Sequence, residues 1–310
     1  MKNEFVNNTL VIIGVDDEPI SIIVLIFDLI EGFMEYKVVN IVLCYKNENE
    51  VLAYAKKLAN QTAADCIALV VVINARNEMS EEKFRESLEA TSIDSYIFDP
   101  GANLGYMNGL NYGYHEYLKN GNVPKYAVYS NTDIDYKSEV FFETLLSKQY
   151  SEDVKCIGPA VSVSSLETYD NPIADNRRTI REINSLIRRF SLPVFCQIYV
   201  WLAFIKPMIF KREKDMISRN VYEVHGCFFI IEGTFASVFC KEEYEPLMYS
   251  EETFVAENIF REGYTEYYDA ELEVIHLEHT VTKTLKPKLR AEYMAESMKW
   301  IRKKYYDVKI

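Results

Sequence analysis

The sequence predicts an α/β protein whose central sheet is mostly parallel and flanked by helices. Between residues 38 and 130, short apolar runs rich in β-branched residues alternate with amphipathic segments of helical period. That order is typical of parallel strands joined by helical crossovers on both faces of a sheet. The chain has 310 residues, 49% of them hydrophobic, which is enough for one large domain or two smaller ones with a substantial core.

Four strands are expected in this first half. Val38–Tyr45 and Cys66–Asn74 are continuous apolar runs, the pattern of strands buried on both faces, and Ser95–Asp99 and Tyr126–Ser130 are shorter. Ligands of such sheets bind at the carboxyl ends of the strands. The polar segments expected at those ends are Tyr45–Asn47, Asn74–Asn77, Asn103–Asn108 and Asn131–Asp135.

Helices are expected between these strands. Glu48–Asn60 places its apolar residues on one face, and Asn108–Leu118 ends at an Asn-Gly pair that is typical of a helix terminus. Ser80–Ala90 is also helical, with Ser80 as its N-cap and two glutamates in its first turn.

The remaining elements are expected at both ends of the chain. Residues 1–37 contain a strand at Thr9–Val15 and an apolar helix or strand at Ile20–Met34, together read as a packing extension. The later elements are a strand at Val224–Ile231 with Gly226 inside it, a helix at Glu251–Glu262, extended segments at Tyr267–Tyr268 and Leu272–His276, and a C-terminal helix at Ala291–Tyr306.

Residues 171–220 differ in composition from the rest of the chain. They contain ten Lys and Arg residues against four Asp and Glu, and the basic residues flank an apolar, aromatic run at Leu192–Phe210. Basic flanks around such a run are typical of a segment that lies on an anionic membrane surface. Pro193 and Pro207 argue against one unbroken helix. An ordinary helical hairpin with solvated ends explains the composition equally well.

Charge and cysteine usage restrict the function and the compartment. The net charge is -13 and the pI about 5.0, which argues against broad nucleic-acid binding because that needs a basic face. Six cysteines lie far apart without a Cys-x-x-Cys pair, which disfavours a zinc site or a disulfide framework. The start of the chain has no basic signal-peptide pattern. These features predict a cytoplasmic protein.

Two carboxylates follow the Tyr126–Ser130 strand. Asp133 and Asp135 are spaced by one residue, so in an extended backbone both side chains point to the same side and can face one cation. Oxygen ligands suit Mg²⁺ or Mn²⁺, and these cations suit diphosphates. A solvated turn explains an isolated Asp-x-Asp pair equally well, so the prediction depends on the neighbouring motifs.

These motifs resemble those of family 2 glycosyltransferases with the GT-A fold, a Rossmann-like α/β fold, and in particular rhamnosyl- and galactosyltransferases. The resemblance extends over about Val38 to His279. The matching segments are Asn103–Gly113, Asn131–Asp135, His225–Ile230, Leu247–Glu252, Arg261–Tyr264 and Val274–His276. Where many family members carry an Asp after the second strand, this chain has Asn74.

The resemblance implies roles for individual residues. Glu252 matches the catalytic base, with Glu251 as the alternative, although two acids in the first turn of a helix also stabilise it through its dipole. A divalent cation, Mn²⁺ or Mg²⁺, is implied as cofactor, with Asp133, Asp135 and His276 as its ligands. The implied donor-binding residues are Tyr45, Asn47, Asn74, Asn103, Gly105, Asn108, Asn131 and Asp133.

The resemblance also implies an activity and a domain organisation. An inverting glycosyltransferase would move a sugar from a nucleotide-diphosphate sugar to a hydroxyl of a glycan or lipid-linked glycan in cell-surface polysaccharide synthesis. It would be cytoplasmic, with the inner face of the cell membrane as a candidate peripheral site. The expected parts are an extension at 1–37, a nucleotide-sugar-binding half at 38–136, an acceptor and catalytic half at 137–279 with a helical insertion at 171–220, and a C-terminal helix at 280–310.

Two other functions are compatible with part of this pattern. A nucleotidyltransferase shares a Rossmann-like core and metal carboxylates, but it needs a glycine-rich loop after the first strand, and Tyr45–Glu50 contains no glycine. A non-catalytic sugar-nucleotide-binding subunit would have lost its acid pair or its metal carboxylates, and this chain has both.

Overall fold

The computed structural model describes most of the chain. The described residues are 4–6, 9–11, 36–77, 79–164, 166, 168–192, 194–198, 201–202, 205, 211–277 and 286–307. The chain divides into two compact units, residues 1–35 and 36–310. In the first unit, β1 (Glu4–Val6) pairs antiparallel with β2 (Thr9–Val11). The apolar segment expected at 20–34 lies outside the described residues, and the finer division expected within 38–310 stays a prediction.

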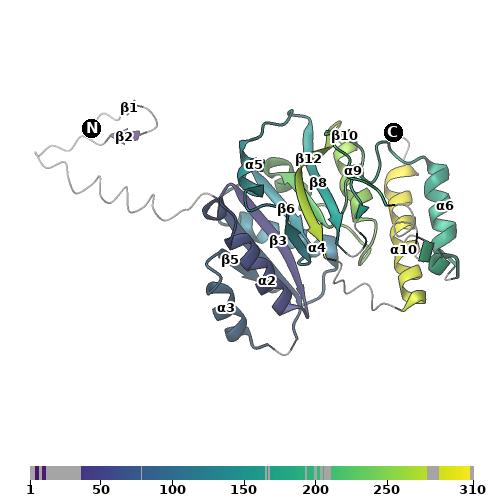
Figure 1. Cartoon of the computed structure of the whole chain (residues 1–310), viewed down its shortest axis with the longest axis horizontal. Helices are drawn as coiled ribbons and strands as arrows, with labels where there is room; N and C mark the ends of the chain where they lie inside the picture. Colours follow the sequence, from purple (N-terminus) through teal and green to yellow (C-terminus); the bar gives the residue numbers. More distant parts are fainter. Residues whose placement is uncertain are drawn as a thin grey trace, which may run out of the picture. The chain divides into compact units, whose positions relative to one another are not determined.

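The described strands of the larger unit form one 10-stranded sheet (Figure 1). Its strands are β3 (Val38–Tyr45), β4 (Ile67–Ala75), β5 (Asp94–Phe98), β6 (Tyr126–Ser130), β7 (Ile134–Tyr136), β8 (Val154–Val163), β9 (Thr168–Tyr169), β10 (Arg219–Val221), β11 (Phe228–Glu232) and β12 (Thr265–His276). Strands β5, β4, β3 and β6 pair in parallel in that order. Strand β11 runs antiparallel between β6 and β8, and β8 pairs in parallel with β12.

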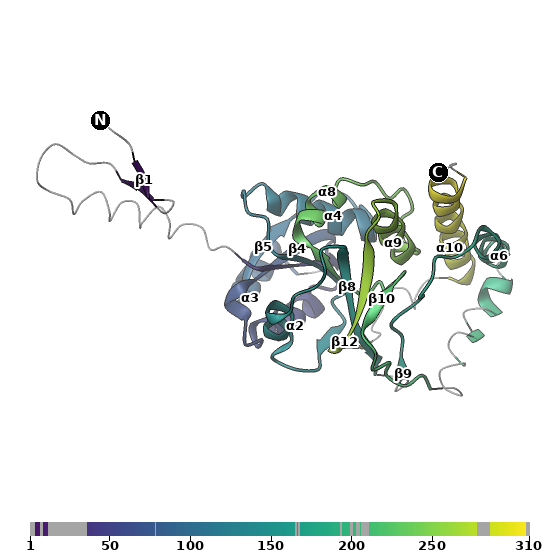
Figure 2. The same ribbon diagram turned by 90° about the horizontal axis from the view of Figure 1, so that it is seen from above.

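Helices cover both faces of this sheet (Figure 2). The α-helices described in the larger unit are α2 (Glu48–Ala59), α3 (Glu81–Glu89), α4 (Tyr106–Leu118), α5 (Phe141–Ser147), α6 (Ile180–Phe190), α8 (Gly233–Phe239), α9 (Glu251–Arg261) and α10 (Pro287–Ile301). A π-helical turn at Arg302–Tyr306 continues α10. Strand β3 shows the layering, because Val39 and Ile41 pack with α4 while Val38 and Val42 pack with α2. The predicted α/β class, with a sheet flanked by helices, is confirmed.

Most elements of the first half begin and end within two residues of the expected positions. The Ser80 hydroxyl accepts a hydrogen bond from the Lys83 amide at 3.3 Å and caps α3 as predicted. The two extended segments expected at 267–268 and 272–276 form one strand, β12, with an irregular register against β8 between Asp269 and Glu273.

One expected strand begins later than predicted. β11 starts at Phe228, so Gly226 lies in the turn before it instead of inside the strand. The His225 Nδ1 atom accepts a hydrogen bond from the Cys227 amide at 3.1 Å, and the Phe228 amide donates to the His225 carbonyl at 3.4 Å. These local bonds replace the sheet pairing that a strand over 224–227 would need.

Across the part of the chain that the structure describes, no helix combines the length and the apolar character needed to span a membrane.

Candidate functional site

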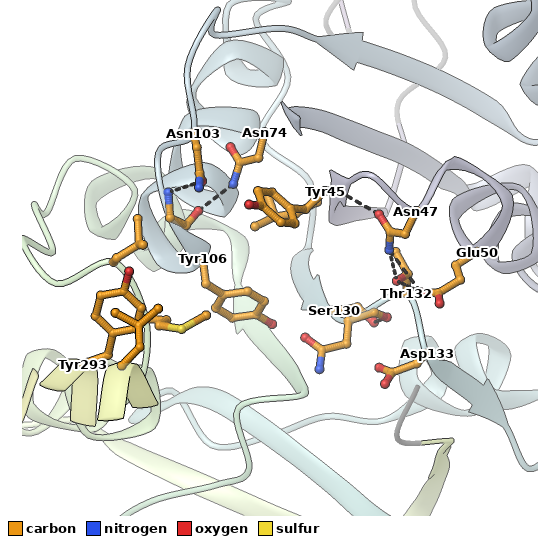
Figure 3. Close-up of a pocket in the computed structure, with 16 residues that line it drawn as sticks. Tyr45, Asn47, Glu50, Asn74, Asn103, Tyr106, Ser130, Thr132, Asp133 and Tyr293 are labelled. Atoms are coloured by element: carbon orange, nitrogen blue, oxygen red, sulfur yellow. Dashed lines mark hydrogen bonds between the residues drawn. The ribbon is translucent and has the colours of Figure 1, made fainter. Parts of the chain in front are cut away.

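A pocket of about 370 Å³ opens at the carboxyl ends of β3, β4 and β6 (Figure 3). This is the edge at which ligands bind in open α/β sheets. Segments far apart in the sequence line it: Leu43, Tyr45, Asn47, Glu50, Asn74, Asn103, Gly105, Tyr106, Ser130, Asn131, Thr132, Asp133, Leu247, Met248, Leu289 and Tyr293. Most of the polar side chains follow strand ends, whereas Leu247 and Met248, together with Leu289 and Tyr293 of α10, form a largely apolar side.

The predicted donor-binding residues lie around this pocket, with one exception. Those that line it are Tyr45, Asn47, Asn74, Asn103, Gly105, Asn131 and Asp133. Asn108 is not among the lining residues, because both atoms of its amide bind the backbone of Tyr244. Its Nδ2 donates to the Tyr244 carbonyl at 2.7 Å and its Oδ1 accepts from the Tyr244 amide at 3.0 Å. Asn108 therefore holds the segment before α9 against α4 and does not reach a ligand.

A hydrogen-bonded cluster fixes the ends of β3 and β6. The Asn47 Oδ1 accepts from the Tyr45 amide at 2.8 Å, and its Nδ2 donates to the Thr132 hydroxyl at 2.9 Å and to the Glu50 carboxylate at 3.1 Å. Glu50 and Thr132 were not predicted as site residues. A glutamate in the first turn of a helix has an ordinary stabilising role, so no local pattern singled out Glu50.

The turn before α4 depends on Gly105. Its φ of 80° and ψ of -172° lie in a region that is essentially restricted to glycine. The Asn74 Nδ2 donates to the Gly105 carbonyl at 2.8 Å, and the Tyr106 amide donates to the Leu247 carbonyl at 3.1 Å. A Cβ atom at Gly105 would lie 2.5 Å from the Leu247 carbonyl oxygen. The absence of a side chain therefore lets the two walls of the pocket meet.

The Gly105→Ala substitution is expected to lower the free energy of unfolding by about 3 kcal/mol, since it adds backbone strain to a clash with a fixed carbonyl. Gly101→Ala is the matched control, because Gly101 also has a positive φ, 73°, but a Cβ atom there meets nothing within 4 Å. It should cost about 1 kcal/mol. Urea unfolding of both variants measures the difference, and equal losses would contradict the role given to the Leu247 contact.

Asp133 lines the pocket and lies against His276, which is not itself among the lining residues. The His276 Nε2 lies 3.4 Å from the Asp133 Oδ1, and both residues are buried. The His276 Nε2 makes no hydrogen bond to any described residue. A carboxylate oxygen and an imidazole nitrogen are both donor atoms that a divalent cation such as Mn²⁺ accepts. No group of three or more His, Cys, Asp or Glu residues suited to a metal occurs among the described residues.

The expectation that Asp133 and Asp135 face one cation is not met. Residues 132–133 form a turn and β7 begins at Ile134, so the backbone is not extended across both aspartates. In the antiparallel pairing of β7 with β12, Ile134 stands opposite His276 and Asp135 opposite Ile275. Asp135 therefore belongs to the other face, where its Oδ2 lies 3.6 Å from the Lys57 Nζ.

A second histidine lies beside His276. The rings of His225 and His276 meet edge to face with centroids 5.9 Å apart. Burial lowers the pKa of His225, so its ring is neutral, and its Nδ1 accepts the Cys227 N–H. The Nε2 of a neutral ring in that arrangement carries the proton. The Nε2–H group of His225 is consequently available to donate a hydrogen bond beside His276, a role that the sequence did not predict.

The two predicted acids lie in different surroundings. Glu252 is partly exposed, and a Cβ atom at Gly226 would lie 2.6 Å from its Oε1. The Gly226 carbonyl accepts a hydrogen bond at 3.1 Å from the hydroxyl of Tyr106, which lines the pocket. Glu251 is buried, and burial together with the negative charge of Glu252 raises its pKa. Glu252 is therefore the more accessible of the two acids, and it approaches the pocket through Gly226 without being one of its lining residues.

Further buried carboxyl groups lie behind Glu252. Burial raises the pKa of Glu223 to about 7, although Arg178 forms an ion pair with it and opposes the shift. Burial, with smaller contributions from Glu223 and Glu252, raises the pKa of Glu266 well above its usual range. The Glu266 Oε2 accepts a hydrogen bond from the Val224 amide at 2.7 Å, while its Oε1 makes none.

A Glu266→Gln variant is expected to be more stable than the parent protein at pH 8, by about 1 kcal/mol or more. The pKa of Glu266 is higher in the folded than in the unfolded protein. The protonated Glu266 side chain therefore costs no stability below about pH 4.5, but the protein loses stability as the pH rises, because the unfolded chain releases this proton more easily. Glutamine does not titrate, so the gain should vanish near pH 4. Urea unfolding at both pH values tests this, with the exposed Glu262→Gln as control; a gain independent of pH would contradict it.

The apolar side of the pocket was also missed by the sequence prediction. Leu247 and Met248 precede α9, and Leu289 and Tyr293 lie in the first turns of α10. The Ser250 and Ser297 hydroxyls lie 2.9 Å apart and tie the two segments together. Leu247 and Met248 belong to a motif segment in which only the two acids were assigned a role. Leu289 and Tyr293 stand at helical spacing, where a leucine and a tyrosine are far more often core residues.

Comparisons with known proteins find likenesses in structure but none in sequence. No protein-family model matches the sequence, and no curated protein matches it. The fold is similar to that of the mannosyltransferase PcManGT from Pyrobaculum calidifontis, solved in complex with GDP-Man and Mn²⁺. The TM-score is 0.50 at 11% sequence identity, over 87% of this chain and 73% of that chain. The chain therefore has a fold that a glycosyltransferase also adopts.

Proposed function

We propose that the protein transfers a sugar from a nucleotide-diphosphate sugar to a hydroxyl of an acceptor with the help of a divalent cation. One observation carries the proposal. One pocket at the strand ends is lined by polar hydrogen-bonding groups, by Asp133 and by Tyr106; His276 contacts Asp133, and Glu252 lies against Gly226, whose carbonyl accepts a hydrogen bond from Tyr106. The likeness to a mannosyltransferase that binds GDP-Man and Mn²⁺ supports it at the level of the fold.

The polar side of the pocket would bind the donor. The exposed ring of Tyr45 offers a face for a nucleobase, and the ends of β3 and β6 are fixed around it by Asn47. The Asn103 and Asn131 amides can bind sugar hydroxyls or phosphate oxygens. The donor sugar and its nucleobase are set by the shape of this pocket.

Asp133 and His276 would hold the cation on the donor diphosphate. A bound Mn²⁺ or Mg²⁺ would act as a Lewis acid and neutralise negative charge on the leaving nucleoside diphosphate. The mixed oxygen and nitrogen donors suit Mn²⁺ better than an all-oxygen site would. Asp135 has no part in this assignment, since it belongs to the opposite face of β7.

Glu252 would act as the general base. Its carboxylate would take the proton from the acceptor hydroxyl while the oxygen of that hydroxyl attacks the anomeric carbon of the donor. A single displacement of this kind inverts the anomeric configuration. Burial raises the pKa of Tyr106 well above its usual range, so its phenol stays protonated and continues to donate to the Gly226 carbonyl beside Glu252.

The apolar side of the pocket would face the acceptor. Tyr293 lies on the side of Tyr106 opposite to Asp133 (Figure 3), and Leu247, Met248 and Leu289 line the same pocket. An acceptor with an apolar group near its reactive hydroxyl would bury that group there. A glycan carried on a lipid in cell-surface polysaccharide synthesis has this character, and we propose it as the acceptor class. We also propose that the protein belongs to glycosyltransferase family 2, since its sequence motifs resemble those of that family.

Release of nucleoside diphosphate from a panel of sugar nucleotides, with Mn²⁺ and with a mixture of glycan and alkyl-glycoside acceptors, tests the proposal. We expect one donor to be consumed, faster with an acceptor than with water, and consumption to stop when the metal is chelated. Consumption of no donor, or cleavage of nucleoside triphosphates instead, would overturn it.

A further inference from the structure

An outward-facing apolar surface follows α6. Residues 194–198 and 201–202 are helical, and Val194, Phe195, Ile198, Trp201 and Leu202 stand at the spacing that places residues on one face of a helix. All five are exposed, from 46% for Ile198 to 69% for Val194. Cys196 is buried instead, and its sulfur lies 3.8 Å from that of Met294 on α10. The segment thus turns a cysteine to the protein and its large apolar side chains outward.

The neighbouring helix α6 provides basic groups on the same surface. Arg188, Arg189, Leu192 and Phe195 together line a shallow hollow of about 580 Å³. That hollow has no carboxylate among its lining residues. Inward-facing residues of α6, Ile183 and Phe190, pack on α10, and the two helices lie side by side in both views (Figures 1 and 2). The arginines are therefore held at the edge of the apolar face.

The charge of this surface contrasts with that of the whole protein. The whole chain carries a net charge of -13. The hollow beside α6 is instead lined by two arginines and no acidic residue. Other arginines of the insertion are already used inside the fold, since Arg177 pairs with Glu257 and Arg178 with Glu223. Arg188 has no ion pair among the described residues, and Arg189 donates a hydrogen bond only to Ser185 there.

We propose that a surface formed by Arg188, Arg189 and Leu192 together with Val194, Phe195, Ile198, Trp201 and Leu202 docks the protein on an anionic lipid bilayer. The apolar face of the helix would enter the boundary between headgroups and acyl chains, with Trp201 at the level of the headgroups, and Arg188 and Arg189 would bind lipid phosphates. Aromatic and aliphatic side chains beside arginines are the combination that such surfaces use. This proposal does not depend on the proposed sugar transfer.

Flotation of the full chain with vesicles tests the proposal. The protein should float with mixed phosphatidylcholine–phosphatidylglycerol vesicles, and much less with phosphatidylcholine alone or in high salt. Replacing both Arg188 and Arg189 by Glu should weaken binding by about ten-fold or more. Phe195→Glu should weaken it by about ten-fold.

Matched controls come from other surfaces. Val238 on α8 is 65% exposed, so Val238→Glu alters an equally exposed apolar residue outside the proposed surface. The Lys56→Glu, Lys83→Glu double variant reverses two exposed charges on α2 and α3. Both control variants should float like the parent protein. Thermal melting of each variant, compared with the parent, identifies any that fail to fold.

A spectroscopic measurement needs no disruptive variant. Trp201 is exposed and should shift its fluorescence to shorter wavelength on the mixed vesicles, with the shift absent in Trp201→Phe. Absence of flotation and of any shift would overturn the proposal. Equal flotation of the surface variants and the control variants would also overturn it. So would a parent protein that does not float and instead forms a dimer in lipid-free solution, if Phe195→Glu dissociates that dimer.

Discussion

Asp133→Asn is expected to lower the rate of sugar transfer by about 100-fold or more. The substitution keeps the size of the side chain but removes the negative charge that stands 3.4 Å from the His276 Nε2. Under the proposed assignment, a cation held on the donor diphosphate would lose a ligand, and the charge of the leaving group would be less well neutralised. Steady-state release of nucleoside diphosphate at saturating donor, over a range of Mn²⁺ concentrations, measures the loss.

Asp135→Asn is the matched control for this experiment. Asp135 lies two residues further on and forms a partly exposed ion pair with Lys57. Exposed pairs contribute little to stability, so the rate should stay within about three-fold of the parent value. If Asp135→Asn is as damaging as Asp133→Asn, both aspartates serve the cation and the assignment from β7 pairing is wrong.

Glu252→Gln is expected to have the second large effect, a loss of about 100- to 10,000-fold in kcat. Glutamine keeps the shape of the side chain beside Gly226 but cannot accept a proton from the acceptor hydroxyl. Donor binding should be unchanged, since the donor side of the pocket is formed by other residues. Turnover and the melting-temperature shift with donor nucleotide, measured on the same variant, separate the two effects.

Glu251→Gln gives the comparison that decides between the two acids. Burial and the charge of Glu252 raise the pKa of Glu251, which favours its protonated form. A glutamine resembles that neutral form, so kcat should change by less than about five-fold. A larger loss for Glu251→Gln than for Glu252→Gln would reverse the assignment of the base.

The fold was predictable because its signals are local. Strands β3 and β4 are continuous apolar runs, and the Ser80 cap marks the start of α3. That the predicted polar residues would gather at one pocket was predictable for the same reason, since they directly follow strands whose ends meet at one edge. Local motifs and a known topology were sufficient for these residues.

The other features depend on contacts between distant segments. Asn108 lies in a motif that resembles a donor site, but the Tyr244 backbone, which binds its amide, is 136 residues away. The turn at 132–133 separates two aspartates that an extended strand would align. Leu289 and Tyr293 reach the pocket only because α10 packs beside the segment that precedes α9. Sequence periodicity contains no information about such neighbours.

The central claim is that the pocket beside Asp133 binds a nucleoside diphosphate through a divalent cation. The most direct measurement is the melting temperature with UDP, GDP, dTDP and CDP, each with and without Mn²⁺, in the parent protein and in Asp133→Asn. Ligands that bind the folded state raise the melting temperature. We expect a metal-dependent rise with one nucleotide, which Asp133→Asn abolishes and Asp135→Asn preserves. A rise in melting temperature that is equal with and without Mn²⁺, or no rise with any nucleotide, would contradict the claim.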